Sequence, residues 1–152
     1  MTNKEFTIVR DLDAVPDRVW EAWTDPELMA QWMHPNGVHT PRESVSSDVR
    51  VGGRYAYTMV HDETGTEYPT GGQYLELDRP RLLVCTWGLP DDPVDTAPRV
   101  TVRLGPTDAG TRMTFTCVGI EAHPGDDNVY DGWSEALDNL DQQTSGVRTR
   151  QD

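Results

Sequence analysis

The sequence predicts an α+β domain in which a curved antiparallel sheet of about six or seven strands wraps around one long C-terminal helix. Three observations predict this arrangement. Several segments alternate apolar and polar residues, as half-buried strands do. Two prolines near the N-terminus stand where short helices can begin, directly after the first of these segments. The last part of the chain repeats apolar residues every three or four positions, which is typical of an amphipathic helix.

The N-terminal part reads as one strand followed by two short helices. Residues Phe6–Asp13 alternate and form the first expected strand. A helix can begin near Pro16, because a proline in the first helical turn loses no backbone hydrogen bond. The run Asp25-Pro26-Glu27 repeats the start signal with an acidic cap, so we expect a second helix over Pro26–Trp32.

The middle of the chain is predicted to be a succession of antiparallel strands. We expect them over Gly52–His61, Gly72–Asp78, Arg81–Leu89, Arg99–Pro106 and Thr111–Ile120. Residues 62–72 are interpreted as a turn-rich connection, and residues 107–110 as the turn of a hairpin. The final helix is expected over Val129–Gln143.

Composition narrows the classes of function. The 152 residues suit a single domain, here placed at residues 1–145 with a flexible tail at 146–152. A net charge of −13 argues against binding to nucleic acid or to an anionic membrane surface. No segment is long and apolar enough to span a bilayer, and the N-terminus lacks the apolar core of a signal peptide. We therefore expect a cytoplasmic protein.

Several motifs resemble those of the heat-shock-protein ATPase activator homologue (AHSA-type) family, part of the START-like or SRPBCC superfamily. The first is R-x-L-x-A-x-P-x-x-V-W-x-A-W-T-D-P-E-L-x-x-x-W from Arg10 to Trp32, followed by Pro35 and by V-G-G-R-Y at Val51–Tyr55. Further matches are Gly72, R-P-x-x-L-V-x-T-W at 79–87, G-T-R-M-T at 110–114 and Gly132-Trp133. The resemblance covers roughly residues 6 to 142 and implies a helix-grip fold.

The resemblance implies a cavity between sheet and final helix, because START-like relatives bind lipids, hormones or polyketides there. We expect this chain to bind a small hydrophobic or amphipathic molecule, with no cofactor. Two alternatives stay open: a cyclase- or hydratase-like enzyme that uses the same cavity, and a co-chaperone-like or regulatory protein-interaction module. A solid core without a usable pocket is a further alternative. A homodimer is plausible for small members of the superfamily, and the sequence does not show one.

Strand alternation selects candidate residues for the cavity wall, provided that no bulge exchanges the two sheet faces. The expected ligand-binding residues are aromatic or apolar, with one imidazole. They are Trp32, Tyr55, Tyr57, Met59, His61, Trp87, Met113, Phe115, Trp133 and Leu137. Trp20 and Trp23 are expected to anchor the helix pair, whereas Trp32 fits either packing at the cavity mouth or contact with a ligand.

Catalytic and metal-binding signatures are missing from the sequence. The spacing of the four histidines fits no zinc pattern, and no nucleophile motif is present. His61 is the best general acid–base candidate, although its place at a strand end beside Asp62-Glu63 favours a solvated surface histidine. An enzyme of the cyclase or hydratase type would use His61 or Tyr57 to move protons. Cys85 and Cys117 are expected to stay reduced, because the strand holding Val100–Leu104 should lie between them. No catalytic residue and no metal ligand is therefore assigned.

Overall fold

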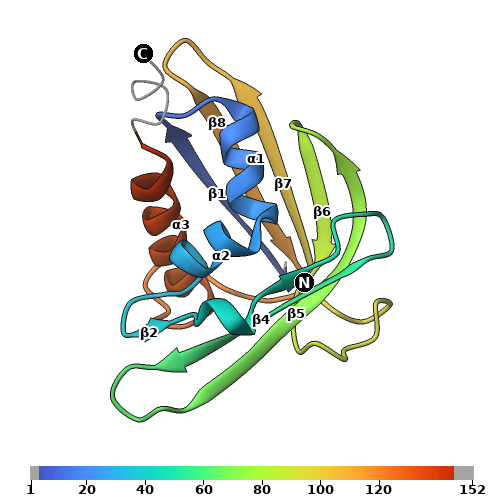
Figure 1. The fold of residues 1–152 in the computed structure, drawn as a ribbon, viewed down its shortest axis with the longest axis vertical. Coiled ribbons are helices and arrows are strands. Elements are labelled where there is room, and N and C mark those ends of the chain that lie inside the picture. Colours follow the sequence, from blue (N-terminus) through green and yellow to red (C-terminus); the bar gives the residue numbers. More distant parts are fainter. Residues whose placement is uncertain (1–3, 146–152) are drawn as a thin grey trace.

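Eight strands form one antiparallel sheet in the order β1-β8-β7-β6-β5-β4-β2, with β3 paired to the other part of β4 (Figure 1). The computed structural model describes residues 4–145. The strands are β1 (Glu5–Leu12), β2 (Val38–His39), β3 (Ser46–Ser47), β4 (Arg54–His61), β5 (Glu67–Asp78), β6 (Leu82–Thr86), β7 (Arg99–Pro106) and β8 (Thr111–Val118). Six of them are long, in agreement with the predicted number, and β2 and β3 have two residues each.

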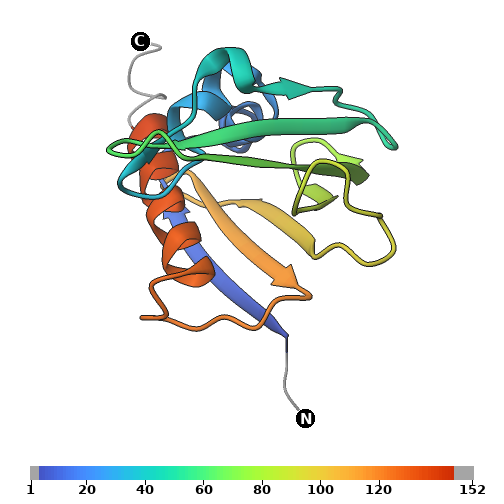
Figure 2. The ribbon, with the colours of Figure 1, turned by 90° about the horizontal axis from the view of Figure 1, so that it is seen from below.

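Within residues 4–145, three α-helices complete the fold, together with a single 3-10 turn, η1 (Arg42–Ser44). They are α1 (Pro16–Thr24), α2 (Pro26–Trp32) and α3 (Val129–Thr144). Both short helices begin at the prolines that predicted them, and the side chain of Asp25 caps α2 by accepting from the Glu27 amide. The helix α3 packs against α1, α2 and β1, so the helices gather on one face of the sheet (Figures 1 and 2). This is the predicted helix-grip arrangement.

The core lies between that face of the sheet and the helices. Alternate residues of β8 point inward, and Met113, Phe115 and Cys117 are fully buried there. Arg10 of β1 fastens the sheet to α3 by donating hydrogen bonds to Ser134 Oγ over 3.0 Å and Asp138 Oδ1 over 3.2 Å. The burial of apolar side chains in this core supplies most of the free energy that holds α3 on the sheet.

The strand β5 begins five residues before its expected start, because residues 67–71 belong to the sheet and not to a turn. The glycines that suggested a turn are required by close packing between strands. A Cβ at Gly72 would lie 2.0 Å from the carbonyl oxygen of Thr86, and one at Gly71 would lie 2.6 Å from that of Tyr55. The prediction of a turn-rich connection is therefore wrong beyond residue 66.

Other boundaries differ less from the expectation. β6 ends at Thr86 and β8 at Val118, and α3 extends to Thr144. As predicted, β7 separates β6 from β8, and Cys85 and Cys117 are buried free thiols. The predicted tail at 146–152 lies outside the described residues. None of the helices in the described part of the chain is long and apolar enough to cross a bilayer.

Candidate ligand-binding groove between sheet and α3

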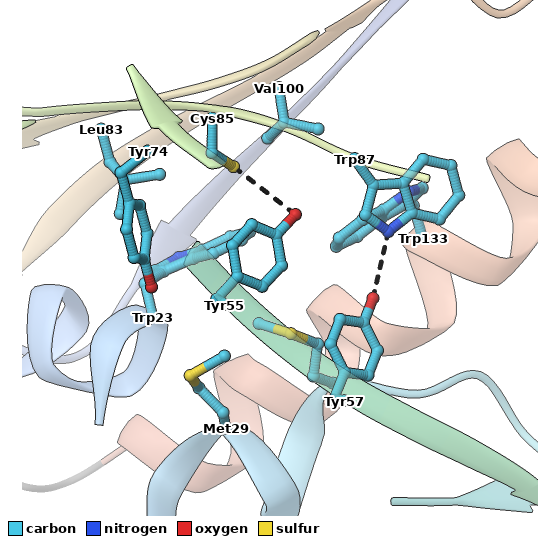
Figure 3. Close-up of a pocket in the computed structure, with 11 residues that line it drawn as sticks. Trp23, Met29, Tyr55, Tyr57, Tyr74, Leu83, Cys85, Trp87, Val100 and Trp133 are labelled. Carbon is cyan, nitrogen blue, oxygen red and sulfur yellow. Dashed lines mark hydrogen bonds between the residues drawn. The ribbon is translucent and has the colours of Figure 1, made fainter. Parts of the chain in front are cut away.

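A small inner cavity lies between the sheet and the helices (Figure 3). Its volume of about 20 Å³ has room for roughly one water molecule. Its walls come from α1, α2, the strands β4 to β7 and α3. They consist of Trp23, Met29, Met33, Tyr55, Tyr57, Tyr74, Leu83, Cys85, Trp87, Val100 and Trp133.

Hydrogen bonds hold the aromatic walls of the inner cavity in place. The hydroxyl of Tyr55 donates to the carbonyl oxygen of Thr86 over 2.6 Å. The indole Nε1–H of Trp87 donates to the hydroxyl oxygen of Tyr57 over 3.1 Å, as the dashed line in Figure 3 shows. Burial raises the pKa of both tyrosines far above the ordinary range, so both stay neutral at physiological pH.

A larger outer groove, with a volume of about 180 Å³, lies next to the inner cavity. It is bounded by the segment after α2, by β4, by Trp87 and by the N-terminal half of α3. Its lining consists of Met33, His34, Pro35, Tyr57, Met59, Trp87, Asn128, Val129, Gly132, Trp133 and Ala136. Most of these side chains are apolar or aromatic, and none carries a carboxylate or an ammonium group, which is the usual make-up of a small-molecule site.

Four residues line both spaces and so form the wall between them. They are Met33, Tyr57, Trp87 and Trp133. The ring centroids of Trp87 and Trp133 lie 5.3 Å apart at an interplanar angle of 60°. Phe115 supports Trp133 from the core side, with the ring centroids 4.6 Å apart. The outer groove therefore has a rigid aromatic floor and a flexible methionine beside it.

The one imidazole in the groove wall belongs to His34. It is half-buried, and its pKa is lowered chiefly by this burial and further by the nearby His39, while Asp62 acts in the opposite direction. The neutral form of His34 is therefore the dominant one at neutral pH. His39 Nδ1 lies 2.7 Å from Asp62 Oδ1, outside the groove lining.

The thiols contribute no nucleophile. Burial raises the pKa of Cys85 and of Cys117 to about 12, so both are protonated at neutral pH. Within residues 4–145, no group of three or more His, Cys, Asp or Glu side chains is arranged to hold a metal ion.

The structure brings half of the expected ligand-binding residues to these two spaces. Tyr57, Met59, Trp87 and Trp133 line the outer groove, and Tyr55 lines the inner cavity. The other five residues line neither space, so neither pocket would bring them into contact with a ligand. They are Trp32, His61, Met113, Phe115 and Leu137.

Burial in the core keeps four of these residues away from both spaces, and turn hydrogen bonds account for the place of His61. Trp32 is fully buried, and its indole N–H donates to the carbonyl oxygen of Ala22 over 2.8 Å, so it joins α2 to α1 and does not form a cavity mouth. Met113, Phe115 and Leu137 are fully buried in the hydrophobic core, where Phe115 packs against Trp133 of the groove floor. His61 ends β4, where its Nδ1 accepts hydrogen bonds from the amides of the following turn.

Several groove residues that precede β2 or start α3 are absent from the residues expected to bind a ligand. The most important are His34, Pro35, Asn128, Val129 and Gly132. Strand alternation could not find them, because they belong to loops and to a helix end. Pro35 and Gly132 are nevertheless positions of the motifs quoted above, and a Cβ on Gly132 would lie 3.8 Å from Pro35 Cβ. Membership of those motifs is the sequence signal that could have marked this loop and the start of α3.

The fold and this groove define a START-like protein of the helix-grip type. Residues 13–144 match the family described as Activator of Hsp90 ATPase homolog 1-like protein, and the chain belongs to that family. No protein with a curated functional description matches the chain.

Solved structures from several bacteria share the fold. Protein CV1439 from Chromobacterium violaceum superposes with a TM-score of 0.81 at 30% identity, and the match covers 93% of this chain and 97% of that one. A protein from Arthrobacter aurescens gives a TM-score of 0.75 at 26% identity, over 93% and 86% of the two chains. The AHSA1-like protein from Aeromonas hydrophila gives 0.75 at 22% identity, over 91% and 90%.

Proposed function

We propose that this protein binds a small hydrophobic or amphipathic molecule in the outer groove, between the sheet and α3. The observation that carries the proposal is a volume of about 180 Å³ lined mainly by apolar and aromatic side chains. For comparison, an apolar cavity of about 150 Å³ engineered in another protein binds benzene. The groove therefore suits a molecule of one or two rings, or a short branched chain.

Burial of apolar surface would supply most of the affinity. A ligand that buries about 150 Å² of apolar surface gains roughly 4 kcal/mol before the entropic cost of association. The Nε1 atom of Trp133 is one of the few buried side-chain atoms in the described part of the chain that has no hydrogen-bond partner. A ligand acceptor atom at that position would relieve the cost of leaving this donor unpaired.

The two alternatives have less support. A cyclase- or hydratase-like reaction was expected to use His61 or Tyr57. His61 accepts hydrogen bonds within a turn, and Tyr57 keeps its proton because burial raises its pKa far above neutrality. For a protein-interaction module, the expected contact surface was an exposed apolar patch near Trp32 or the acidic surface of the protein, and Trp32 itself is fully buried.

The test is a titration with 1-naphthol, a two-ring probe, followed by the NMR signals of the Trp87 and Trp133 indole N–H groups. The wild type should bind saturably, and native mass spectrometry of freshly purified protein would show any ligand already retained. The variant Gly132→Leu places a side chain in the groove and should abolish binding. Gln142→Leu, at an exposed position on the same helix, is the matched control and should bind like the wild type.

Two results would count against the proposal: no saturable shift of either indole signal in the wild type, or equal binding by Gly132→Leu and Gln142→Leu.

A further inference from the structure

The hydrogen bonds around His34 determine which of its ring nitrogens carries the proton. Thr40 is buried, and its hydroxyl lies 3.1 Å from the carbonyl oxygen of Met33 and 3.3 Å from His34 Nδ1. A carbonyl oxygen can only accept, so the single hydroxyl proton of Thr40 goes to Met33. The hydroxyl oxygen is then left as an acceptor, and His34 Nδ1 must be the donor.

A neutral imidazole with a proton on Nδ1 has a lone pair on Nε2. In the part of the chain that the structure describes, no protein group bonds to His34 Nε2. Thr40 does not line the groove, whereas His34 does. Thr40 thus holds the ring at its Nδ1 side, and His34 is one of the residues that line the groove.

The backbone of His34 is fixed as well. Its amide donates to the carbonyl oxygen of Trp32 over 2.8 Å, and its carbonyl oxygen accepts from Asn139 Nδ2 of α3 over 3.0 Å. The titratable groups that face this loop are His39 and Asp62 on the sheet side, and Glu135 of α3, which accepts from the amide of Asn36 over 2.9 Å. None of these three lines the groove.

We propose that Thr40 holds His34 in the Nδ1–H tautomer, so that Nε2 is a hydrogen-bond acceptor in the groove and selects ligands that carry a hydroxyl or N–H donor. This inference rests on the proposed function and names the ligand class: a flat apolar molecule with a neutral donor group. Carboxylic acids are disfavoured, because at neutral pH they are ionised, bring no donor proton and find no cation in the lining. Thr40 is a positioning residue and acts on the ligand through His34.

The tautomer can be measured without any ligand. Two-bond ¹H–¹⁵N correlation spectra distinguish the ring nitrogens of histidine, and the variant His34→Asn identifies the His34 signals. We expect a protonated Nδ1 at pH 7.5 and a titration midpoint below that of a free histidine. Thr40→Val removes the acceptor and should shift His34 toward the Nε2–H form, whereas Thr40→Ser keeps the hydroxyl and should restore the wild-type spectrum. A protonated Nε2 in the wild type would overturn the inference.

Ligand choice is tested with three probes of one ring system: 1-naphthol, naphthalene and 1-methoxynaphthalene. One additional hydrogen bond predicts that 1-naphthol binds about fivefold more tightly than the other two. This preference should disappear in Thr40→Val and persist in Thr40→Ser. Equal affinity for the three probes in the wild type would refute the inference and leave the proposed function intact. If none of them binds, the proposed function fails and the ligand class falls with it.

Discussion

The indole Nε1–H of Trp87 donates a hydrogen bond to the hydroxyl of Tyr57 over 3.1 Å, between the segment after β6 and the strand β4. Both residues line the inner cavity and the outer groove. The strand β5 separates β6 from β4 in the sheet, so this contact bridges two strands that are not neighbours. It therefore ties β4 to the segment after β6 at the wall between the two spaces.

Replacing Tyr57 with Phe should measure the strength of this contact. The variant leaves the half-buried Trp87 donor without its acceptor, so the free energy of unfolding should fall by about 1 kcal/mol. Urea denaturation monitored by tryptophan fluorescence gives the value. Tyr68→Phe is the control, because Tyr68 is 44% exposed and its hydroxyl forms no hydrogen bond in the described structure. Equal losses in the two variants would show that the Trp87–Tyr57 bond contributes nothing.

The two buried tryptophans Trp23 and Trp32 offer a matched comparison. The rings stack edge to face with centroids 4.7 Å apart, and both side chains are almost fully buried. Trp32 donates to Ala22, whereas the Nε1 atom of Trp23 has no partner. Trp→Phe should therefore destabilise the protein more at position 32 than at position 23, by about 1 kcal/mol in the free energy of unfolding. Denaturant titrations of the two variants measure both losses. A larger loss at position 23 than at position 32 would contradict a stabilising role for the Trp32–Ala22 hydrogen bond.

Two glycines should respond oppositely to substitution by alanine. At Gly132 a Cβ has only an ordinary contact with Pro35, so Gly132→Ala should raise the free energy of unfolding by up to about 1 kcal/mol through helix propensity. At Gly72 a Cβ would lie 2.0 Å from the Thr86 carbonyl oxygen, so Gly72→Ala should cost about 3 kcal/mol or more. Thermal unfolding is sufficient to check both signs. A Gly72→Ala variant as stable as the wild type would mean that β5 and β6 pack less closely than described.

The carboxylate of Asp126 organises the start of α3. It accepts hydrogen bonds from the backbone amides of Asn128, Tyr130, Asp131 and His123, over 2.9, 3.2, 3.2 and 3.3 Å respectively. Desolvation acts to raise the pKa of Asp126, but the four amides outweigh it, and the pKa lies below its ordinary value. A lowered carboxyl pKa means that the stabilisation is complete at neutral pH and is lost as the pH falls through the folded-state value.

Hydrogen exchange tests this anchor. Asp126→Ala should lower the protection of the Tyr130 and Asp131 amides at pH 7, and acidification of the wild type to below the lowered folded-state pKa of Asp126 should reproduce the effect. Asp127→Asn is the control, because Asp127 has a positive φ of 51°, which asparagine tolerates, and its side chain makes no hydrogen bond in the described structure. If the Tyr130 and Asp131 amides were equally protected in Asp126→Ala and in the wild type, the Asp126 carboxylate would not anchor the start of α3.

Local sequence signals predicted most elements closely. The prolines at 16 and 26 start helices by chemistry that needs no distant partner, and the alternation in 99–106 and 111–118 gives strands with nearly the expected limits. The first half of β5 was missed because Gly71 and Gly72 have the local character of a turn. Glycine is needed at these two positions because the backbones of Tyr55 and Thr86 approach too closely for a Cβ. That approach arises only when β4, β5 and β6 have paired.

The candidate site shows the same division. Alternation along β4 by itself put Tyr57 and Met59 on one common face of the strand, because the period of a strand is local. The tertiary structure makes that face the one toward the groove. His34 lines the groove and His61 does not, because the tertiary structure brings the loop after α2 against the start of α3. Sequence by itself determined which residues are apolar and where the helices and most of the strands begin. Only the tertiary structure decided which of those residues line a cavity. A cavity forms where side chains from elements far apart in the sequence do not fill the space between them, so it depends on long-range packing.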